Sequence, residues 1–101
     1  MDDGDKRHML TAPQLRAARG LLGLSQAQTA DAARVGLSTV KNFELGKSTP
    51  IENNLSAIRK ALEAAGVEFI AENGGGVGVR LRKGRDAGST PVKHLTSQND
   101  K

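Results

Sequence analysis

Three residues, Arg34-Val35-Gly36, separate two segments that each favour a short helix. The segment before them, residues 26–33, is rich in Ala and follows Ser25, whose side chain suits the cap of a helix. The segment after them, residues 37–45, ends at Gly46, a residue type that commonly stops a helix. This spacing predicts two short helices joined by a tight turn.

A further helical segment lies on each side of this pair. Residues 12–22 follow Thr11, a suitable helix cap, and residues 52–65 follow Pro50. Apolar residues stand at helical spacing from directly before the second segment into its interior: Ile51, Leu55, Ile58 and Leu62. We therefore expect four short helices.

The periodicity changes from helical to alternating after Gly66. Residues 67–70 form a short strand candidate, and residues 77–82 alternate apolar residues with Gly or Arg. Residues 72–76 lie between them and combine Glu, Asn and three glycines, which favour a turn. The expected fold class is mainly α: four short helices with a central helix-turn-helix, followed by a C-terminal β-hairpin over residues 67–82 and disordered tails.

The two ends of the chain are polar. Residues 1–10 predict a flexible segment without a secretory signal, and residues 83–101 combine Gly, Pro, Ser and scattered charges, which predicts a disordered tail. The expected domain thus covers residues 11–82. The chain has no cysteine and no apolar stretch of membrane-spanning length, so we expect a cytoplasmic protein without disulfides or membrane contact.

The helix predicted over residues 37–45 has two unlike faces. Val40, Phe43 and Glu44 share one face by their spacing. Because the two apolar residues must be buried, Glu44 is expected to be buried with them and to need a partner. Arg19, on the helix expected over residues 12–22, is the partner that we expect.

The opposite face of this helix carries side chains that suit DNA bases. Asn42 can pair with adenine, Ser38 can serve several bases, and Lys41 can reach guanine or a phosphate. Gln26 begins the preceding helix, where free N–H groups attract phosphate. A formal net charge of +4 also favours a polyanion partner. These features indicate a helix that enters the DNA major groove.

Residues 24–50, LSQAQTADAARVGLSTVKNFELGKSTP, resemble the lambda-repressor-like (Xre/Cro-type) helix-turn-helix family. The matching positions are Leu24-Ser25-Gln26, Ala30, Val35, Ser38-Thr39-Val40, Glu44-x-Gly46 and Pro50. The similarity covers about residues 11–65. It implies a dimeric or partner-assisted bacterial or phage transcription regulator that binds double-stranded DNA. We expect a homodimer on a palindromic operator, which associates with the nucleoid when bound.

The resemblance also implies roles for individual residues. Phosphate contact falls on Gln26 and on the loop around Lys47. Base contact falls on one face of the second helix of the motif: Leu37, Ser38 and Asn42, with Thr39 and Lys41 beside them. Arg19 stands where many members carry the arginine that pairs with the glutamate.

Three positions depart from the family pattern. Thr29 stands where the family usually buries a Leu, which thins the core. Arg34 stands where a turn Gly is usual and is expected to bear a left-handed backbone cost, unless Gly36 lets the turn adjust. Gly36 itself replaces a capping Ser or Thr. The hairpin replaces a fifth helix, and its exposed edge can pair with its equivalent in a second chain.

Leu37 and Leu45 leave the function open between two readings. An exposed Leu can read a thymine methyl group. It can also mark a protein-binding patch, in which case the chain is a protein-interaction module on a helix-turn-helix scaffold, antitoxin-like or antiactivator. For Leu45 the simplest expectation is partial burial against the following loop.

No pattern in the sequence favours an enzyme, a metal or a cofactor. The Gly46-Lys47-Ser48 stretch lacks the glycine that a phosphate-binding loop requires at position 41. The histidines, His8 and His94, stand in the two expected tails. A basic run near the end of the hairpin predicts either a solvated face or an arm on the DNA backbone: Arg80, Arg82, Lys83 and Arg85.

Overall fold

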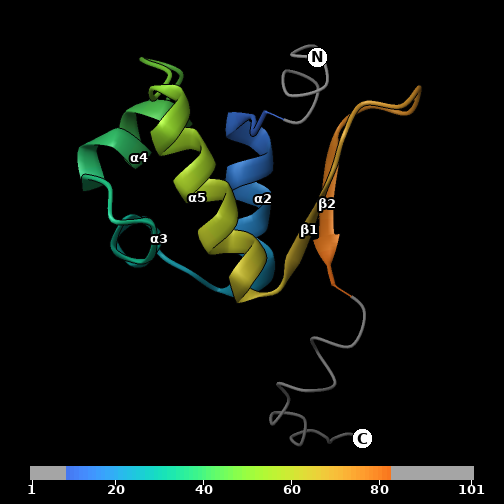
Figure 1. Ribbon diagram of the computed structural model, residues 1–101, viewed down its shortest axis with the longest axis horizontal. Helices are drawn as coiled ribbons and strands as arrows, with labels where there is room; N and C mark the ends of the chain where they lie inside the picture. Colours follow the sequence, from blue (N-terminus) through green and yellow to red (C-terminus); the bar gives the residue numbers. More distant parts are fainter. Residues whose placement is uncertain (1–8, 83–101) are drawn as a thin grey trace, which may run out of the picture.

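The computed structural model describes residues 9–82 of the chain of 101 residues. The expected disordered tail and the first eight residues of the expected flexible segment lie outside this range. Within it, the elements are α2 (Ala12–Leu22), α3 (Gln26–Ala33), α4 (Leu37–Glu44), α5 (Glu52–Ala65), β1 (Val67–Ile70) and β2 (Gly78–Leu81) (Figure 1). The expected fold class, helices followed by an antiparallel hairpin, is confirmed.

Side chains cap the first two helices. Thr11 Oγ1 accepts a hydrogen bond from the backbone N–H of Gln14 at 3.2 Å, and the Thr11 N–H donates to Gln14 Oε1 at 3.0 Å. Ser25 and Gln28 form the same reciprocal pair at the start of α3, with both distances at 2.9 Å. Each pair satisfies N–H groups that a helix start leaves free, so both helix starts are encoded locally.

The turn between α3 and α4 places Arg34 in the left-handed region, with φ 60° and ψ 43°. Gly36 has φ −70° and ψ 147° and caps α4 without a side-chain hydrogen bond. The expectation that Gly36 lets the turn adjust is therefore wrong, because its backbone is one that any residue adopts. Arg34 carries the conformational cost, about 1–2 kcal/mol for a residue with a Cβ.

All four helices and β1 contribute to one apolar core. Leu15, Ile58 and Val40 are fully buried within it. Leu10 is also buried, so the core includes a residue that we assigned to the flexible N-terminal segment. Ile51 is 67% exposed and caps α5, so the predicted apolar stripe begins at Leu55 instead.

Thr29 is fully buried at the position where a Leu is usual. Its hydroxyl donates to the carbonyl oxygen of Ser25, the N-cap of α3 one turn earlier, at 2.9 Å. The buried polar atom is thereby satisfied, so the cost of the shorter side chain lies in lost apolar contact rather than in an unpaired hydroxyl.

The hairpin packs against α2 and α5 with one face. Its register pairs Glu68 with Arg80 and Phe69 with Val79. The buried Gln14 side chain of α2 donates to the Gly78 carbonyl oxygen at 2.8 Å and approaches that of Ile70 at 3.4 Å. Figure 1 shows the hairpin on one side of the α2–α5 pair and α3 and α4 on the other. Any surface on α4 is thus remote from the hairpin.

Candidate nucleic-acid interface

Helix α4 buries one face and exposes the other. Val40 is fully buried and Phe43 is 7% exposed, which fixes the rotation of the helix against α2 and α3. Ser38 and Lys41 are exposed, and Asn42 is half-buried. The outer face therefore presents hydroxyl, ammonium and amide groups to an approaching ligand.

Glu44 is the last residue of α4, and its carboxylate belongs to a network of charge-assisted hydrogen bonds. Arg19 Nε donates to Oε2 and Arg19 Nη2 donates to Oε1, both at 2.7 Å. The Glu44 side chain is 5% exposed, and that of Arg19 is 21% exposed. This is a bidentate pair, the geometry in which an arginine and a carboxylate bind most strongly.

A third residue, Gln26 of α3, completes this network. Its Nε2 donates to Glu44 Oε1 at 3.0 Å. Burial by itself raises the pKa of Glu44, but the hydrogen bonds from Arg19 and Gln26 and the nearby positive charges outweigh it, so that pKa is lowered. The hydrogen bond to Glu44 in turn raises the pKa of Arg19. The carboxylate thus ties α2, α3 and α4 together in its charged form.

Arg16 is a further contributor that sequence analysis missed. Its Nη1 donates to the backbone carbonyl oxygen of Glu44 at 2.7 Å. The guanidinium satisfies a carbonyl group that the end of the helix leaves free. Its positive charge also interacts favourably with the negative end of the helix dipole. The available signal was the spacing of three residues between Arg16 and Arg19, which places both on one side of α2.

Gln26 therefore has a structural role in addition to the phosphate contact that we expected of it. An amide nitrogen carries two hydrogens, and the bond to Glu44 uses one of them. The second hydrogen is compatible with a phosphate oxygen as acceptor. Gln26 is half-buried at the first position of α3, so its side chain still reaches the surface.

The loop after α4 holds Lys47 close to the end of that helix. Gly46 has φ 80°, and the Lys47 N–H donates to the Asn42 carbonyl oxygen at 2.8 Å. The Lys47 side chain is exposed. The expected phosphate-contacting lysine is thus tethered by its backbone to the helix that carries Asn42.

The model of the helix-turn-helix family matches residues 15–69, more than half of the chain. The protein belongs to the lambda-repressor-like helix-turn-helix family. This is a family of DNA-binding regulators and not typically of enzymes. No curated protein matches the sequence.

Two leucines of this helix-turn-helix protein stand out on the α4 side. Leu45 is 70% exposed and Leu37 is 39% exposed. The expectation that Leu45 is partly covered by the following loop is wrong, because the loop backbone folds back to Asn42 and leaves this side chain in solvent. Both leucines therefore flank the polar outer face of α4.

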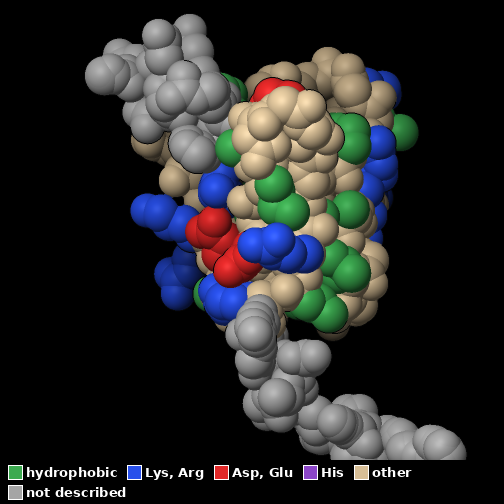
Figure 2. Space-filling view, turned by 90° about the vertical axis from the view of Figure 1, so that its right-hand side faces the viewer, with side chains coloured by type: hydrophobic (Ala, Val, Ile, Leu, Met, Phe, Trp, Pro, Cys, Tyr) green, Lys and Arg blue, Asp and Glu red, His purple; other side chains and the backbone are tan. Residues whose placement is uncertain are grey.

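The basic residues of the hairpin lie on the other side of the molecule. Arg80 Nε pairs with Glu68 Oε1 at 2.8 Å, and Arg82 Nη2 donates to the Glu63 carbonyl oxygen at 2.8 Å. Figure 2 shows this side, where acidic side chains lie between basic ones. Lys83 and Arg85 lie outside the described residues. Arg80 and Arg82 do not share a surface with α4, which favours the solvated-face interpretation over a DNA arm.

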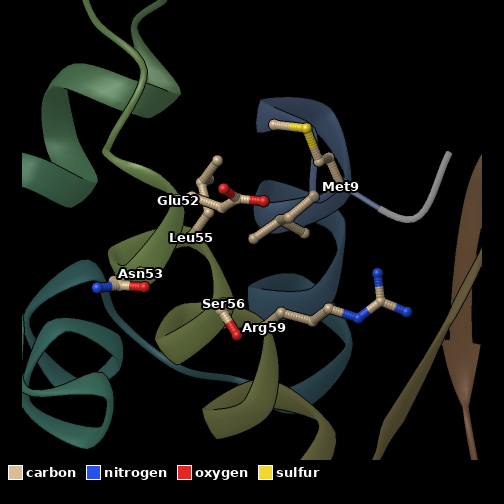
Figure 3. Close-up of a pocket in the computed structure, with 7 residues that line it drawn as sticks. Met9, Glu52, Asn53, Leu55, Ser56 and Arg59 are labelled. Carbon is tan, nitrogen blue, oxygen red and sulfur yellow. The ribbon is translucent and has the colours of Figure 1, made fainter. Parts of the chain in front are cut away.

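A pocket of about 370 Å³ opens between the start of α2 and the helix α5 (Figure 3). It is lined by Met9, Leu10, Glu52, Asn53, Leu55, Ser56 and Arg59. The Arg59 guanidinium is already engaged with Glu63 at 3.0 Å and lies 5.4 Å from the centre of the Phe69 ring.

In residues 9–82 no cluster of three or more potential metal ligands is found. None of the helices in this range is long and apolar enough to cross a membrane.

Proposed function

We propose that this family member is a sequence-specific transcription regulator that binds a palindromic operator as a homodimer, with α4 in the major groove. The single observation that carries this proposal is the two-faced α4. Val40 and Phe43 fix its inner face, so Ser38, Lys41 and Asn42 are presented outward on a rigid element. Rigid presentation favours base readout, because the backbone that carries these side chains needs no ordering on binding.

In this proposal the predicted DNA-contacting residues other than Thr39 each have a distinct task. Asn42 reads an adenine, Ser38 and Lys41 contact neighbouring base edges, and Leu37 contacts a thymine methyl group. Thr39 is half-buried beside them. Gln26 and Lys47 hold phosphates on either side of the groove and set the position of α4. The protein acts in the cytoplasm and lies on the nucleoid when it is bound.

The test is the affinity of the full chain for genomic DNA fragments at two salt concentrations. The proposal predicts one strongly preferred fragment and a steep loss of affinity as salt rises, because phosphate contacts release counterions. Lys47→Ala serves as a matched variant that should lose affinity for every fragment and part of the salt dependence, because it removes one phosphate contact. Equal weak binding to all fragments would contradict sequence-specific regulation.

The exposure of Leu45 favours a second candidate function, a protein-interaction module of the antitoxin or antiactivator kind. A side chain that is 70% exposed contributes apolar area that a protein partner can bury. A pull-down with the wild-type chain and with Leu45→Lys separates the two functions. A stoichiometric protein partner lost only in Leu45→Lys, without salt-dependent DNA binding, would support this second function.

A further inference from the structure

Within residues 9–82, the edge of β2 that faces away from β1 pairs with no other strand. The Arg82 N–H donates to the Gly66 carbonyl oxygen at 2.8 Å, which sets the phase of the antiparallel ladder. In that phase Glu68 and Arg80 face each other as a hydrogen-bonded pair, and the N–H and C=O groups of Val79 and Leu81 point away from β1. These groups form a template for another strand.

Apolar side chains accompany this edge. Val77, directly before β2, is 44% exposed, and Leu81, the last residue of β2, is 38% exposed. Figure 2 shows hydrophobic side chains in a stripe along one flank of the hairpin side. Proteins usually protect an open edge with charges, a proline or a cover, and residues 77–81 contain one charged residue, Arg80, which Glu68 already engages.

We propose that β2 pairs antiparallel with β2 of a second copy of this chain, in the register centred on Val79. The two hairpins then form one four-stranded sheet in the order β1-β2-β2-β1, related by a twofold axis. This inference rests on the proposed function, of which it specifies the dimer, and it can fail or stand independently of DNA binding.

The side chains of β2 select this register. With Val79 at the centre, Val77 lies opposite Leu81 of the second copy, so two exposed apolar residues cover each other. Arg80 lies opposite Gly78 of the second copy, where there is no side chain to repel it. Val79 and Leu81 share the outward phase of hydrogen bonding, so the ladder needs no bulge, and the proposed pairing extends it by one residue to Val77, which precedes β2.

The neighbouring registers are less favourable. Centring on Arg80 places two arginines directly opposite each other, and like charges in that position destabilise a sheet. A register centred on Gly78 would include turn residues in the ladder. One of them, Gly76, has φ 90° and is not extended. The Val79 register uses residues 77–81 alone.

This dimer leaves both copies of α4 free. The hairpin lies on the opposite side of the α2–α5 pair from α4 (Figure 1). Pairing through β2 therefore covers neither the outer face of α4 nor the loop that carries Lys47. A single protein can then use the hairpin for self-association and α4 for another ligand.

Substitution at Gly78 tests the pairing with matched variants. A Cβ at this position meets Ile70 Cδ1 at 3.6 Å, an ordinary contact, so the hairpin accommodates a side chain. Gly78→Glu places a carboxylate opposite Arg80 of the second copy, and Gly78→Arg places a like charge there. Sedimentation equilibrium of the full chain without DNA should give a dimer dissociation constant roughly tenfold lower for Gly78→Glu than for Gly78→Arg.

Unfolding curves for both variants separate effects on the monomer fold from effects on pairing. Ile51→Lys is the control for a surface charge away from the hairpin, and its dissociation constant should equal that of the wild type. A wild-type chain that stays monomeric at all concentrations, or equal dissociation constants for the two Gly78 variants, would overturn the proposal.

Single cysteines test the register, since the chain contains none of its own. Val79→Cys places two cysteines across the twofold axis with Cα atoms about 5.5 Å apart, within reach of a disulfide. Val77→Cys should not cross-link to itself, but it should cross-link when mixed with Leu81→Cys. Self-linking of Val77→Cys at the rate of Val79→Cys would overturn the register.

DNA measurements keep the two proposals apart. Gly78→Arg should weaken operator affinity by lowering the dimer population while retaining the preference of Asn42 for its base. If the chain dimerises through β2 but binds no DNA selectively, the proposed function fails and the inference stands. If it binds an operator and the Gly78 variants associate equally, the inference fails and the proposed function stands.

Discussion

One residue of this protein, Arg34, is held in an unfavourable backbone conformation. Arg34 occupies a left-handed conformation that costs a residue with a Cβ about 1–2 kcal/mol, and its side chain is exposed. Arg34→Gly should therefore raise the free energy of unfolding by roughly 0.5–1 kcal/mol, after the extra entropy of an unfolded Gly is subtracted. Urea denaturation measures this.

A matched control for Arg34 is Gly23, which ends α2 with φ 71°. Gly23→Ala makes the opposite change at an equivalent helix end and should lower the free energy of unfolding by a similar amount. A stability of Arg34→Gly equal to or below that of the wild type would show that the Arg34 side chain compensates for its backbone.

Glu44 links stability to pH. Its pKa is lowered in the folded state, so its charged form stabilises the fold above the pKa of the unfolded group, about 4.3. That contribution is lost as the pH falls through the lower, folded value. Glu44→Gln should cost roughly 1–3 kcal/mol at pH 7 because Arg19 loses its counter-charge. It should also flatten the decline in stability as the pH falls below the unfolded value of about 4.3.

The control for Glu44 is Glu68, whose side chain is 41% exposed and pairs with Arg80 on the surface. Glu68→Gln should change stability by less than about 1 kcal/mol, as exposed ion pairs usually do. Denaturation curves at several pH values compare the two. Equal losses in both variants would mean that the Glu44 network is no stronger than a surface pair.

At the scale of elements, the helices were predictable because their signals are local. Thr11 and Ser25 cap helices that begin where the sequence indicates, and the change of period after Gly66 marks the hairpin. Tertiary links were less predictable. The burial of Leu10, the exposure of Ile51 and the contact from Arg16 to Glu44 depend on how elements approach each other. The DNA-contacting roles stay predictions, since they depend on a ligand.

Gln14 connects two elements and offers a test at this scale. It closes the capping box of α2 and also donates to the Gly78 carbonyl oxygen of the hairpin. Gln14→Ala should cost about 1–2 kcal/mol and increase hydrogen exchange at the turn end of the hairpin, because the Gly78 carbonyl oxygen loses the side-chain donor that ties the hairpin to α2.

Gln28 is the matched control, since it occupies the same place in the capping box of α3 and is exposed. Gln28→Ala should cost less and leave exchange in the hairpin unchanged. The link between helix and hairpin would be disproved if both variants changed hairpin exchange equally.

At the scale of the whole molecule, the two sides have separate uses. The α4 side carries exposed polar and basic groups, and the hairpin side carries an open strand edge. Lys47→Ala should weaken binding to all DNA sequences alike and reduce the salt slope by about one unit, because it removes one phosphate contact. Affinities measured at several salt concentrations test this. A loss confined to one operator sequence would instead place Lys47 at a base.

The proposed regulator reads base edges through the outer face of α4. The most direct measurement is the affinity of the wild type and of Asn42→Ala for the preferred fragment and for every single base-pair substitution in it. Asn42→Ala should lose about 1–3 kcal/mol of discrimination at one base position in each half-site and none elsewhere. Identical profiles for the two proteins across all substitutions would contradict it.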